Sequence, residues 1–416
     1  MEHKVMYLAF LFVVYSFAGW LIESIRSSIM NKKIVNRGMI NLPFVIVYGL
    51  TAIIISVASF DTRNVLLVFT GSVIYSTFME LSAGKLLEVF NRGKWWDYSS
   101  YFLNLGGYVA LLPSLLWGVI GTVSFLYINP LLLKVFNMID YEVLKIIIFS
   151  VLILMVIDFI ISYLSLIKPK SNKIIDSKNK INLSNEVFNR VAEAYPIINK
   201  NKNTFSKDAF NIYKFLIYVI IGGILGCMCE MVFCRFTMHQ WMSRSSLIYG
   251  EISLVWGLGL ALFTSFLHMY RNKSSLFIFV YGMILGTAFE YLCGSFCEFF
   301  YGYAFWSYRH LPLNINGRVQ ILFALIWGFT ALIYIKYVYK RLNNLLEKIP
   351  ERPGKIAVTI MVLLLILDIS ISVSAGIRFS ERRKNLPPSN IVEEICDKYY
   401  TDEYMTSRFK NLKIVE

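Results

Sequence analysis

The sequence predicts an all-α polytopic membrane protein with about ten transmembrane helices in two five-helix repeats. Composition, long apolar runs and an internal duplication all favour this fold. Hydrophobic residues make up 56% of the 416 residues and charged residues only 16%, whereas charged residues are about 25% of a typical soluble protein. The composition therefore excludes an ordinary soluble protein and predicts a multi-pass protein of the cell membrane, with the lipid bilayer as its surroundings.

Ten apolar runs approach the roughly 20 residues that a helix needs to cross a hydrocarbon core of about 30 Å. The first five runs cover residues 5–25, 42–60, 64–89, 107–133 and 143–167. The other five cover residues 213–234, 247–269, 275–299, 318–338 and 355–376. We therefore expect a first membrane repeat at 1–167, a basic linker at 168–212, a second membrane repeat at 213–376 and a polar tail at 377–416.

The second half of the chain repeats the first. Residues 80–118 recur without a gap at 290–328, so each retained residue returns 210 positions later. The retained acidic and amide residues in this stretch are Glu80, Glu88 and Asn104, which return as Glu290, Glu298 and Asn314. Outside it, Glu23, Arg37 and Asp158 return as Glu230, Arg244 and Asp368. Retention of polar residues in apolar surroundings indicates that these residues share a role.

Basic residues predict the orientation of the repeats. The formal net charge is +14, and lysines are concentrated in the linker 168–212. Cytoplasmic loops of membrane proteins carry such an excess, so the charge predicts a cytoplasmic linker and no nucleic-acid partner. Five crossings per repeat would insert the two copies with opposite orientations, as an inverted repeat. Arg378, Arg382, Arg383 and Lys384 argue against this count, because it places them outside, and an even number of crossings would make the repeats parallel.

Each repeat carries an acidic stripe within its third apolar run. Glu80, Gly84 and Glu88 are spaced by four residues, which places them on one face of a helix. The same spacing holds for Glu290 and Glu298. An ionisable residue at the centre of a spanning helix costs roughly 2.5–3.5 kcal/mol, so the stripes are expected to face protein or a cavity. Arg37 and Arg244 are the candidate partners, with Arg26, Lys85 and Arg235 as unduplicated alternatives.

A segment rich in aromatic residues follows each stripe and includes Asp97 and Asn104 in the first copy and Asn314 in the second. Tryptophan and tyrosine are typical of the membrane interface, which favours a simple anchor. A loop that folds back over a cavity would also place an asparagine amide near a polar solute or near unpaired backbone groups. The sequence leaves both interpretations open.

Asp158 and Asp368 lie in the last apolar run of each repeat, four residues before a serine. An aspartate in this setting either bonds a neighbouring helix or takes part in a proton or cation relay, and the sequence favours the relay. The six cysteines are not shared between the copies, and the four histidines do not correspond. We therefore expect no metal and no cofactor.

Several of these residues together resemble a known bacterial family. The residues are Tyr15 to Glu23, Val35 to Gly38, Tyr48 with Gly49, Glu80 to Glu88, Trp95 to Tyr98 and Asn104. They are similar to the type IV ABC-transporter permeases, the CmpB-like proteins, strongly over residues 7–165 and weakly over 213–376. The resemblance implies a permease that works with a separate ATPase.

The second copy departs from the family pattern, because Ser307 replaces Asp97 and Ser243 and Ser245 replace Asn36 and Gly38. If Asp97 is essential, the second copy would be inactive or specialised. The chain itself has no Gly-x4-Gly-Lys-Ser/Thr phosphate loop, so any ATPase would be a different protein.

Transport is the function that the sequence favours. A permease for a small polar solute or an ion, with a carboxylate-lined site between the two repeats, accounts for the duplication and the intramembrane charges together. An intramembrane lipid-modifying enzyme and a non-transporting membrane partner subunit are the alternatives. No activated serine or cysteine and no metal-ligand spacing supports the enzyme.

Overall fold

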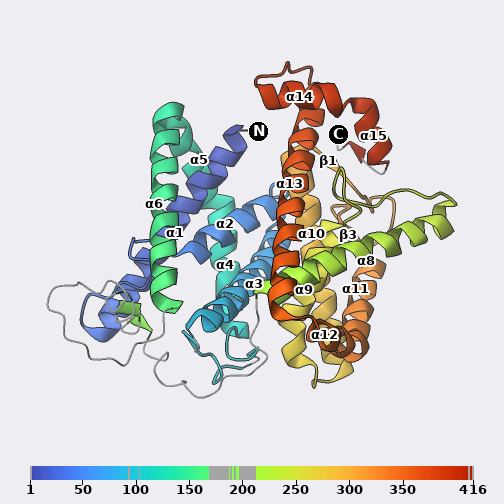
Figure 1. Ribbon diagram of the computed structural model, residues 1–416. Coiled ribbons are helices and arrows are strands. Elements are labelled where there is room, and N and C mark those ends of the chain that lie inside the picture. The colour runs from blue at the N-terminus through green and yellow to red at the C-terminus, as the bar shows by residue number, and fades with distance from the viewer. Residues whose placement is uncertain are drawn as a thin grey trace. The chain divides into compact units, whose positions relative to one another are not determined.

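The structure is a computed structural model that describes residues 2–91, 94–102, 104–167, 187, 190–191, 194–195, 212–410 and 413–414. The chain forms two compact units, residues 1–209 and 210–416. Helices dominate both units (Figure 1). Most of the predicted linker 168–212 lies outside the described residues.

Six helices lie in the described part of the first unit. They are α1 (Glu2–Asn31), α2 (Ile46–Ala58), α3 (Val65–Asn91), α4 (Leu111–Val123), α5 (Asn129–Met138) and α6 (Tyr141–Ile167). A π-helical turn, Ser124–Ile128, joins α4 to α5.

The second unit repeats this order. Its helices are α8 (Ile212–Met238), α9 (Leu254–Leu267), α10 (Ser275–Tyr301), α11 (Ile321–Ile333), α12 (Tyr339–Leu346) and α13 (Glu351–Arg382), with a π-helical turn at Tyr334–Val338 and a 3-10 turn at His268–Tyr270. The tail adds α14 (Ile391–Tyr399) and α15 (Asp402–Arg408). Two small antiparallel pairs join β1 (Tyr303–Ala304) to β4 (Lys413–Ile414) and β2 (Asn314–Ile315) to β3 (Val319–Gln320).

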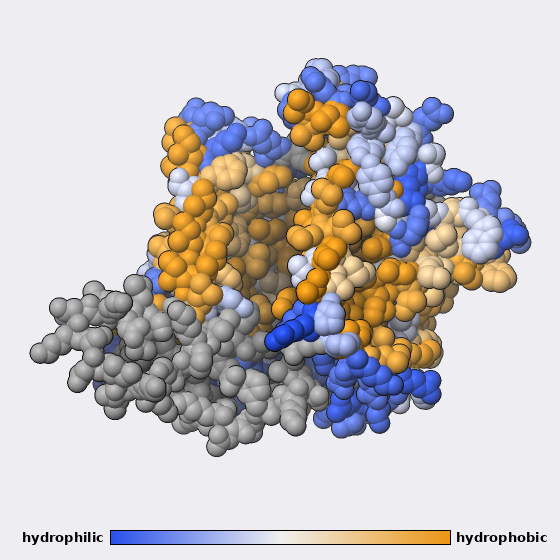
Figure 2. Space-filling view, in the orientation of Figure 1, coloured by the Kyte–Doolittle hydropathy of each residue, from blue (hydrophilic) through white to orange (hydrophobic). Residues whose placement is uncertain are grey.

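Eight described helical segments are long and apolar enough to cross a membrane, four in each unit. Apolar side chains cover the visible faces of α6 and α13, and polar side chains gather at the upper end of each helix (Figure 2). The protein is therefore an all-α, multi-pass membrane protein. The count of ten spanning helices and the inverted relation of the repeats stay predictions.

The second apolar run of each repeat differs from a complete spanning helix. Helix α2 has 13 residues and α9 has 14, which at 1.5 Å per residue is about 20 Å, short of a hydrocarbon core of about 30 Å. Each follows a mostly non-helical segment, residues 32–45 and 239–253, which we call the entry loops.

Each entry loop leads back to the middle of the first helix of its unit. The backbone N–H of Val45 donates to the carbonyl of Ser16, 2.9 Å away, and that of Ser253 donates to the carbonyl of Gly223, 3.0 Å away. Helices α2 and α9 therefore begin beside the centres of α1 and α8.

Glycine allows these half-helices to pack closely. A Cβ atom added at Gly19 would lie 2.3 Å from the ring of Tyr48, and one added at Gly226 would lie 2.2 Å from Trp256. The repeated glycines thus let an aromatic residue of the short helix rest directly on the backbone of the first helix, as small residues do at packed membrane interfaces.

Candidate functional site

The first unit brings Glu23, Arg37 and Tyr48 together from α1, the entry loop and α2. The Tyr48 hydroxyl donates to Glu23 Oε1 at 2.9 Å, and Arg37 Nε lies 3.5 Å from Glu23 Oε2. Both charged side chains are about one quarter exposed. The predicted pairing of Arg37 with an acidic residue therefore occurs, but its partner is Glu23 and not the acidic stripe.

Glu80 on α3 lies beside this pair. The Tyr98 hydroxyl donates to Glu80 Oε1 at 3.1 Å. The second oxygen, Oε2, is buried without a well-formed hydrogen bond, although Trp117 lies within reach of the carboxylate and Glu23 is close enough to repel it electrostatically. A buried carboxylate oxygen that lacks a well-formed hydrogen bond favours a proton or a cation as its partner.

The second unit builds the same cluster from the equivalent positions. Arg244 Nε donates to Glu230 Oε2 at 2.6 Å, and the Trp256 indole also donates to Glu230. Glu290 is buried and accepts 2.9 Å hydrogen bonds from both Tyr308 and Trp327. Glu290 therefore has a well-formed hydrogen bond at each oxygen, whereas at Glu80 the second donor, Trp117, is only within reach.

Aromatic rings join the two carboxylates of each cluster. In the first unit the Tyr48 and Trp117 rings lie 5.1 Å apart between Glu23 and Glu80. In the second, the Trp256 and Trp327 rings lie 5.2 Å apart. The internal repeat did not reveal Tyr48 and Trp256 as a pair, because the two differ in type, although Tyr48 belongs to the family resemblance and Trp117 and Trp327 are repeated at the 210-residue spacing. Each cluster is complete within one unit, and a site between the repeats stays a prediction.

The second glutamate of each stripe has a different kind of partner in the two units. Glu88 accepts a hydrogen bond from Tyr108 and is the electrostatic partner of Lys85. Glu298 binds Arg318, whose Nε lies 3.1 Å from Glu298 Oε2. The sequence analysis did not identify Arg318 as this partner. The signal was available, because Tyr108 is replaced by Arg318 at the 210-residue spacing while the glutamate is retained.

The loop after α3 uses its polar side chains locally. Asp97 accepts a 3.0 Å hydrogen bond from the Ser99 backbone, and Lys94 Nζ lies 3.8 Å away. Burial alone would raise the pKa of Asp97, but the Ser99 hydrogen bonds and the Lys94 charge outweigh burial and lower the pKa. Asp97 is thus a carboxylate that stabilises a turn.

Asn104 and Asn314 satisfy backbone groups of their own loops. The Asn104 amide donates to the carbonyls of Ser99 and Tyr101 at 3.1 and 3.0 Å. The Asn314 amide donates to the carbonyl of Leu311 at 2.7 Å and accepts from the backbone N–H of Gly317 at 2.9 Å. These contacts favour the backbone role that the sequence left open and do not direct either amide at a solute.

Asp158 and Asp368 hold the entry loops. Asp158 accepts from the backbone N–H of Leu42 at 2.7 Å and from the side chain of Asn41 at 2.8 Å. Asp368 accepts from the backbone N–H groups of Gly250 at 2.7 Å and Tyr249 at 3.3 Å. Backbone that has left a helix within a membrane needs such partners, so these contacts favour a structural role over the relay.

Nothing in the described part of the chain groups three or more histidine, cysteine, aspartate or glutamate side chains as metal ligands. The described cysteines are free thiols. The chemistry available at the two clusters is therefore that of paired carboxylates, an arginine and aromatic donors.

Comparison with known proteins identifies the family. A family model described as "Putative ABC-transporter type IV" matches residues 10–163 and again residues 217–373. Neither the curated proteins nor the solved structures yield a match. The two matches cover more than half of the chain, and one falls in each unit. The chain therefore belongs to the type IV ABC-transporter family and carries the family unit twice in tandem.

Proposed function

We propose that this protein moves a small polar solute or an ion across the membrane and that Glu80 and Glu290 are the carboxylates that bind it. Membership of a transporter family supports a transporter-like protein. The observation that carries the proposal is the buried Glu80 Oε2, which lacks a well-formed hydrogen bond. A second carboxylate, that of Glu23, lies close to Glu80.

Charge favours a proton, a cation or the ammonium group of a zwitterion as the bound species. One arginine faces Glu23, and Glu80 adds a second carboxylate to the same cluster. An ionised group at the centre of a spanning helix costs roughly 2.5–3.5 kcal/mol, and a bound positive charge would offset this cost. Glu290 already accepts two well-formed hydrogen bonds, so in this proposal the first unit binds the positive charge more tightly than the second.

The broken crossing also supports transport. We infer that each entry loop and its half-helix cross the membrane together, which gives five crossings per repeat and an inverted pair. Non-helical backbone is tolerated at membrane depth where it is buried in protein or lines a cavity. Transporters place solute sites at such discontinuous helices.

The family suggests an ATPase as a separate partner. Energy from that partner would drive uptake or export, whereas a proton gradient would suffice if Glu80 is coupled to protons. Flux measured in liposomes with the purified chain alone, with and without a pH gradient, distinguishes the two energy sources.

Liposome flux tests the proposal. Uptake of protons, rubidium and a radiolabelled amino-acid mixture would be measured for the wild type, Glu80→Gln and Glu290→Gln. We expect Glu80→Gln to lower flux at least about tenfold while the unfolding temperature is retained, because the amide cannot take up a proton or neutralise a cation. Asp97→Ser is the matched control, because the second repeat naturally has Ser307 there, and it should retain flux.

Equal flux in Glu80→Gln and the wild type would contradict the role of Glu80. A second candidate function, lipid modification, is favoured by the proximity of Glu23 and Glu80, since these carboxylates come from different helices as an acid–base pair would require. Mass spectrometry of the lipids in the same liposomes tests that candidate: a new lipid species without solute flux would favour the enzyme.

A further inference from the structure

Each unit carries an arm that follows its last long helix and returns to the entry loop of the same unit. The first arm contains the described residues Val187, Arg190, Val191, Ala194 and Tyr195. The second arm comprises α14, α15 and β4, residues 391–414. Neither arm was part of the duplication predicted from the sequence.

An arginine of each arm binds carbonyl oxygens of the entry loop. Arg190 donates to the carbonyls of Gly38 at 2.7 Å and Met39 at 2.8 Å. Arg408 donates to the carbonyls of Leu247 at 2.8 Å and Gly250 at 3.2 Å. These carbonyls lie in non-helical backbone and need donors from elsewhere in the protein.

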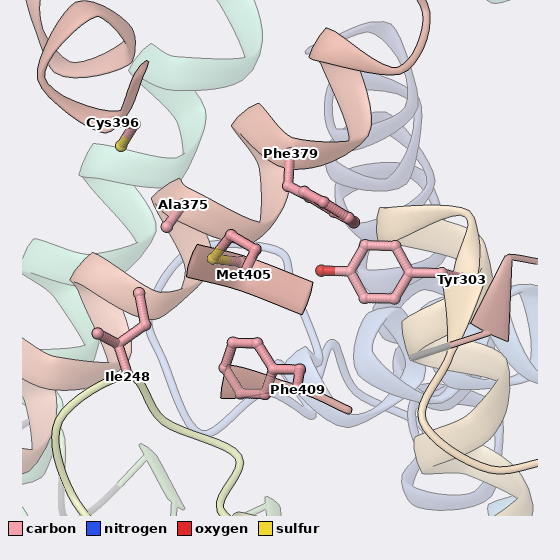
Figure 3. Close-up of a cluster of buried hydrophobic side chains, with 7 residues drawn as sticks. All are labelled: Ile248, Tyr303, Ala375, Phe379, Cys396, Met405 and Phe409. Carbon is pink, nitrogen blue, oxygen red and sulfur yellow. The ribbon is translucent and has the colours of Figure 1, made fainter. Parts of the chain in front are cut away.

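Apolar contacts fasten both arms. In the first unit Val187 and Val191 are buried with Trp95, and Met39 of the entry loop packs against them. The second arm is fastened by a larger cluster of buried residues, which comprises Ile248, Tyr303, Ala375, Phe379, Cys396, Met405 and Phe409. Figure 3 shows Met405 and Phe409 of the second arm near Ile248 of the entry loop, Tyr303 of β1 and Phe379 of α13. Pairing of β4 with β1 adds a backbone contact.

The first arm also contacts the candidate site directly. Arg37 Nη1 donates to the carbonyl of Ala194 at 2.6 Å, and the Arg37 guanidinium lies 4.3 Å from the Tyr195 ring centroid. The Tyr195 hydroxyl donates to the Arg37 carbonyl at 2.7 Å. The arm therefore holds both ends of the arginine that pairs with Glu23.

The second arm reaches the corresponding part of its own unit. Arg408 Nη1 donates to the hydroxyl of Ser243 at 2.9 Å, and Ser243 directly precedes Arg244, the partner of Glu230. Arg408 also forms an ion pair with Glu251 at 2.6 Å. Both arms thus act on the chain next to the site arginine.

A short sequence match supports the equivalence of the arms. Ser184, Asn185, Val187 and Tyr195 return 205 residues later as Ser389, Asn390, Val392 and Tyr400. Asn390 caps α14, since its side chain accepts from the backbone N–H groups of Val392 and Glu393 at 3.1 Å each. The duplicated unit therefore extends beyond its last spanning helix.

We propose that Arg190 and Arg408 are positioning residues with the same role in the two repeats, although the 205-residue spacing places Ile395 and not Arg408 opposite Arg190. Each arginine holds its arm on the entry loop of its own unit and so fixes the arginine that pairs with the first-helix glutamate. The effect on transport rests on the function proposed above, whereas the effect on the entry loop does not.

Hydrogen exchange of the full chain in nanodiscs, read by mass spectrometry, tests the proposal without any substrate. Arg190→Ala should accelerate exchange in peptides covering 36–42 about tenfold and leave 243–251 unchanged, because two hydrogen bonds to the first loop are lost. Arg408→Ala should do the reverse, so each variant is the matched control of the other. Arg190→Lys and Arg408→Lys should lie between wild type and alanine, because lysine keeps the charge but not the planar fork.

Two results would overturn the proposal, and a third would overturn only its effect on transport. Unchanged exchange at 36–42 in Arg190→Ala would show that the arm does not hold the loop. Equal acceleration of hydrogen exchange in both entry loops would show a global loss of stability and not the loss of a local contact. If an alanine variant does not fold, the lysine variant is judged by the same two criteria. Faster exchange with wild-type flux in liposomes would remove the role in transport and leave the proposed function intact.

Absence of flux in the wild type would instead contradict the proposed function. The exchange measurement would still decide whether the arms hold the entry loops. The two failures are therefore distinguishable within one set of variants.

Discussion

Tyr108 and Arg318 occupy the same position in the two repeats, 210 residues apart, and each binds the second glutamate of the acidic stripe in its own unit. The tyrosine brings no charge, whereas the guanidinium of Arg318 forms an ion pair with Glu298. The retained glutamate thus binds an arginine at this position in the second unit and a neutral hydroxyl in the first.

Removal of Arg318 should destabilise the protein strongly. The Arg318 side chain is 1% exposed and that of Glu298 is 8% exposed, so Arg318→Ala would leave a buried carboxylate without its partner. The expected loss is about 3–5 kcal/mol in the free energy of unfolding, measured by denaturant unfolding in detergent. The double variant with Glu298→Ala should regain part of that loss, and Tyr108→Phe in the first repeat should cost only about 1–2 kcal/mol. A fully stable Arg318→Ala protein would contradict the pairing.

Substitution of Asp158 should separate loop anchoring from a relay. Asp158→Ala removes the acceptors of Leu42 and Asn41 and should cost about 1.5–3 kcal/mol, the range for hydrogen bonds to a charged group. Asp158→Asn keeps one acceptor for the Leu42 N–H and should retain most of the flux. The measurements are unfolding in detergent and flux in liposomes. A stable Asp158→Asn protein without flux would instead support the relay that the sequence favours.

The long helices and the duplication could be predicted from the sequence, because hydropathy and repeated spacing are local signals. The half-helices could not be predicted from hydropathy alone, because the runs 42–60 and 247–269 remain apolar where the backbone leaves the helix. Pro43 and Gly250 were the available signal. Each lies in the entry loop of its own unit, and proline disfavours helix at the residue before it.

The contents of the site were predicted better than its arrangement. Glu23 with Arg37 and Glu80 were singled out because they recur, and the structure places these three residues in one cluster. Spacing cannot show which helix faces which, so the aromatic donors Tyr48 and Trp117 were missed. The arms were missed for a similar reason, since Arg190 binds carbonyls more than 150 residues away.

The turn after each acidic stripe should depend on a glycine in the left-handed region. Gly317 has φ +71°, and an added Cβ would lie 2.3 Å from Arg309 Cγ. Gly317→Ala should therefore cost at least about 1–2 kcal/mol, measured by denaturant unfolding, and Gly107→Ala should behave alike because Gly107 has φ +76°. Gly71→Ala in α3 is the matched control: its nearest neighbour would be Tyr75 at 3.6 Å, so it should be neutral or slightly stabilising. Equal costs at Gly317 and Gly71 would contradict the backbone argument.

Acid should release the second arm. Asp397 of α14 accepts hydrogen bonds from Arg378 at 2.8 and 2.9 Å and from Arg382 at 2.8 Å. The Arg378 hydrogen bond lowers the pKa of Asp397 most, burial opposes it, and Arg382 lowers the pKa further. A lowered pKa in the folded state means that the carboxylate stabilises docking above the ordinary aspartate value of about 3.9 and that this contribution is lost as the pH falls through the lowered value.

Hydrogen exchange from pH 7 to pH 2, corrected for intrinsic rates, should therefore show residues 391–408 loosening only below about pH 4. Asp397→Asn should already be loosened at pH 7, because the amide cannot compensate two arginines, and should respond less to acid. Glu381 lies 3.6 Å from Arg378 and titrates in a similar range, so Glu381→Gln serves as the matched control and should keep the acid response. An identical acid response in Asp397→Asn and the wild type would show that another group holds the second arm. Loss of the acid response in Asp397→Asn would show that the second arm is held by Asp397 between Arg378 and Arg382.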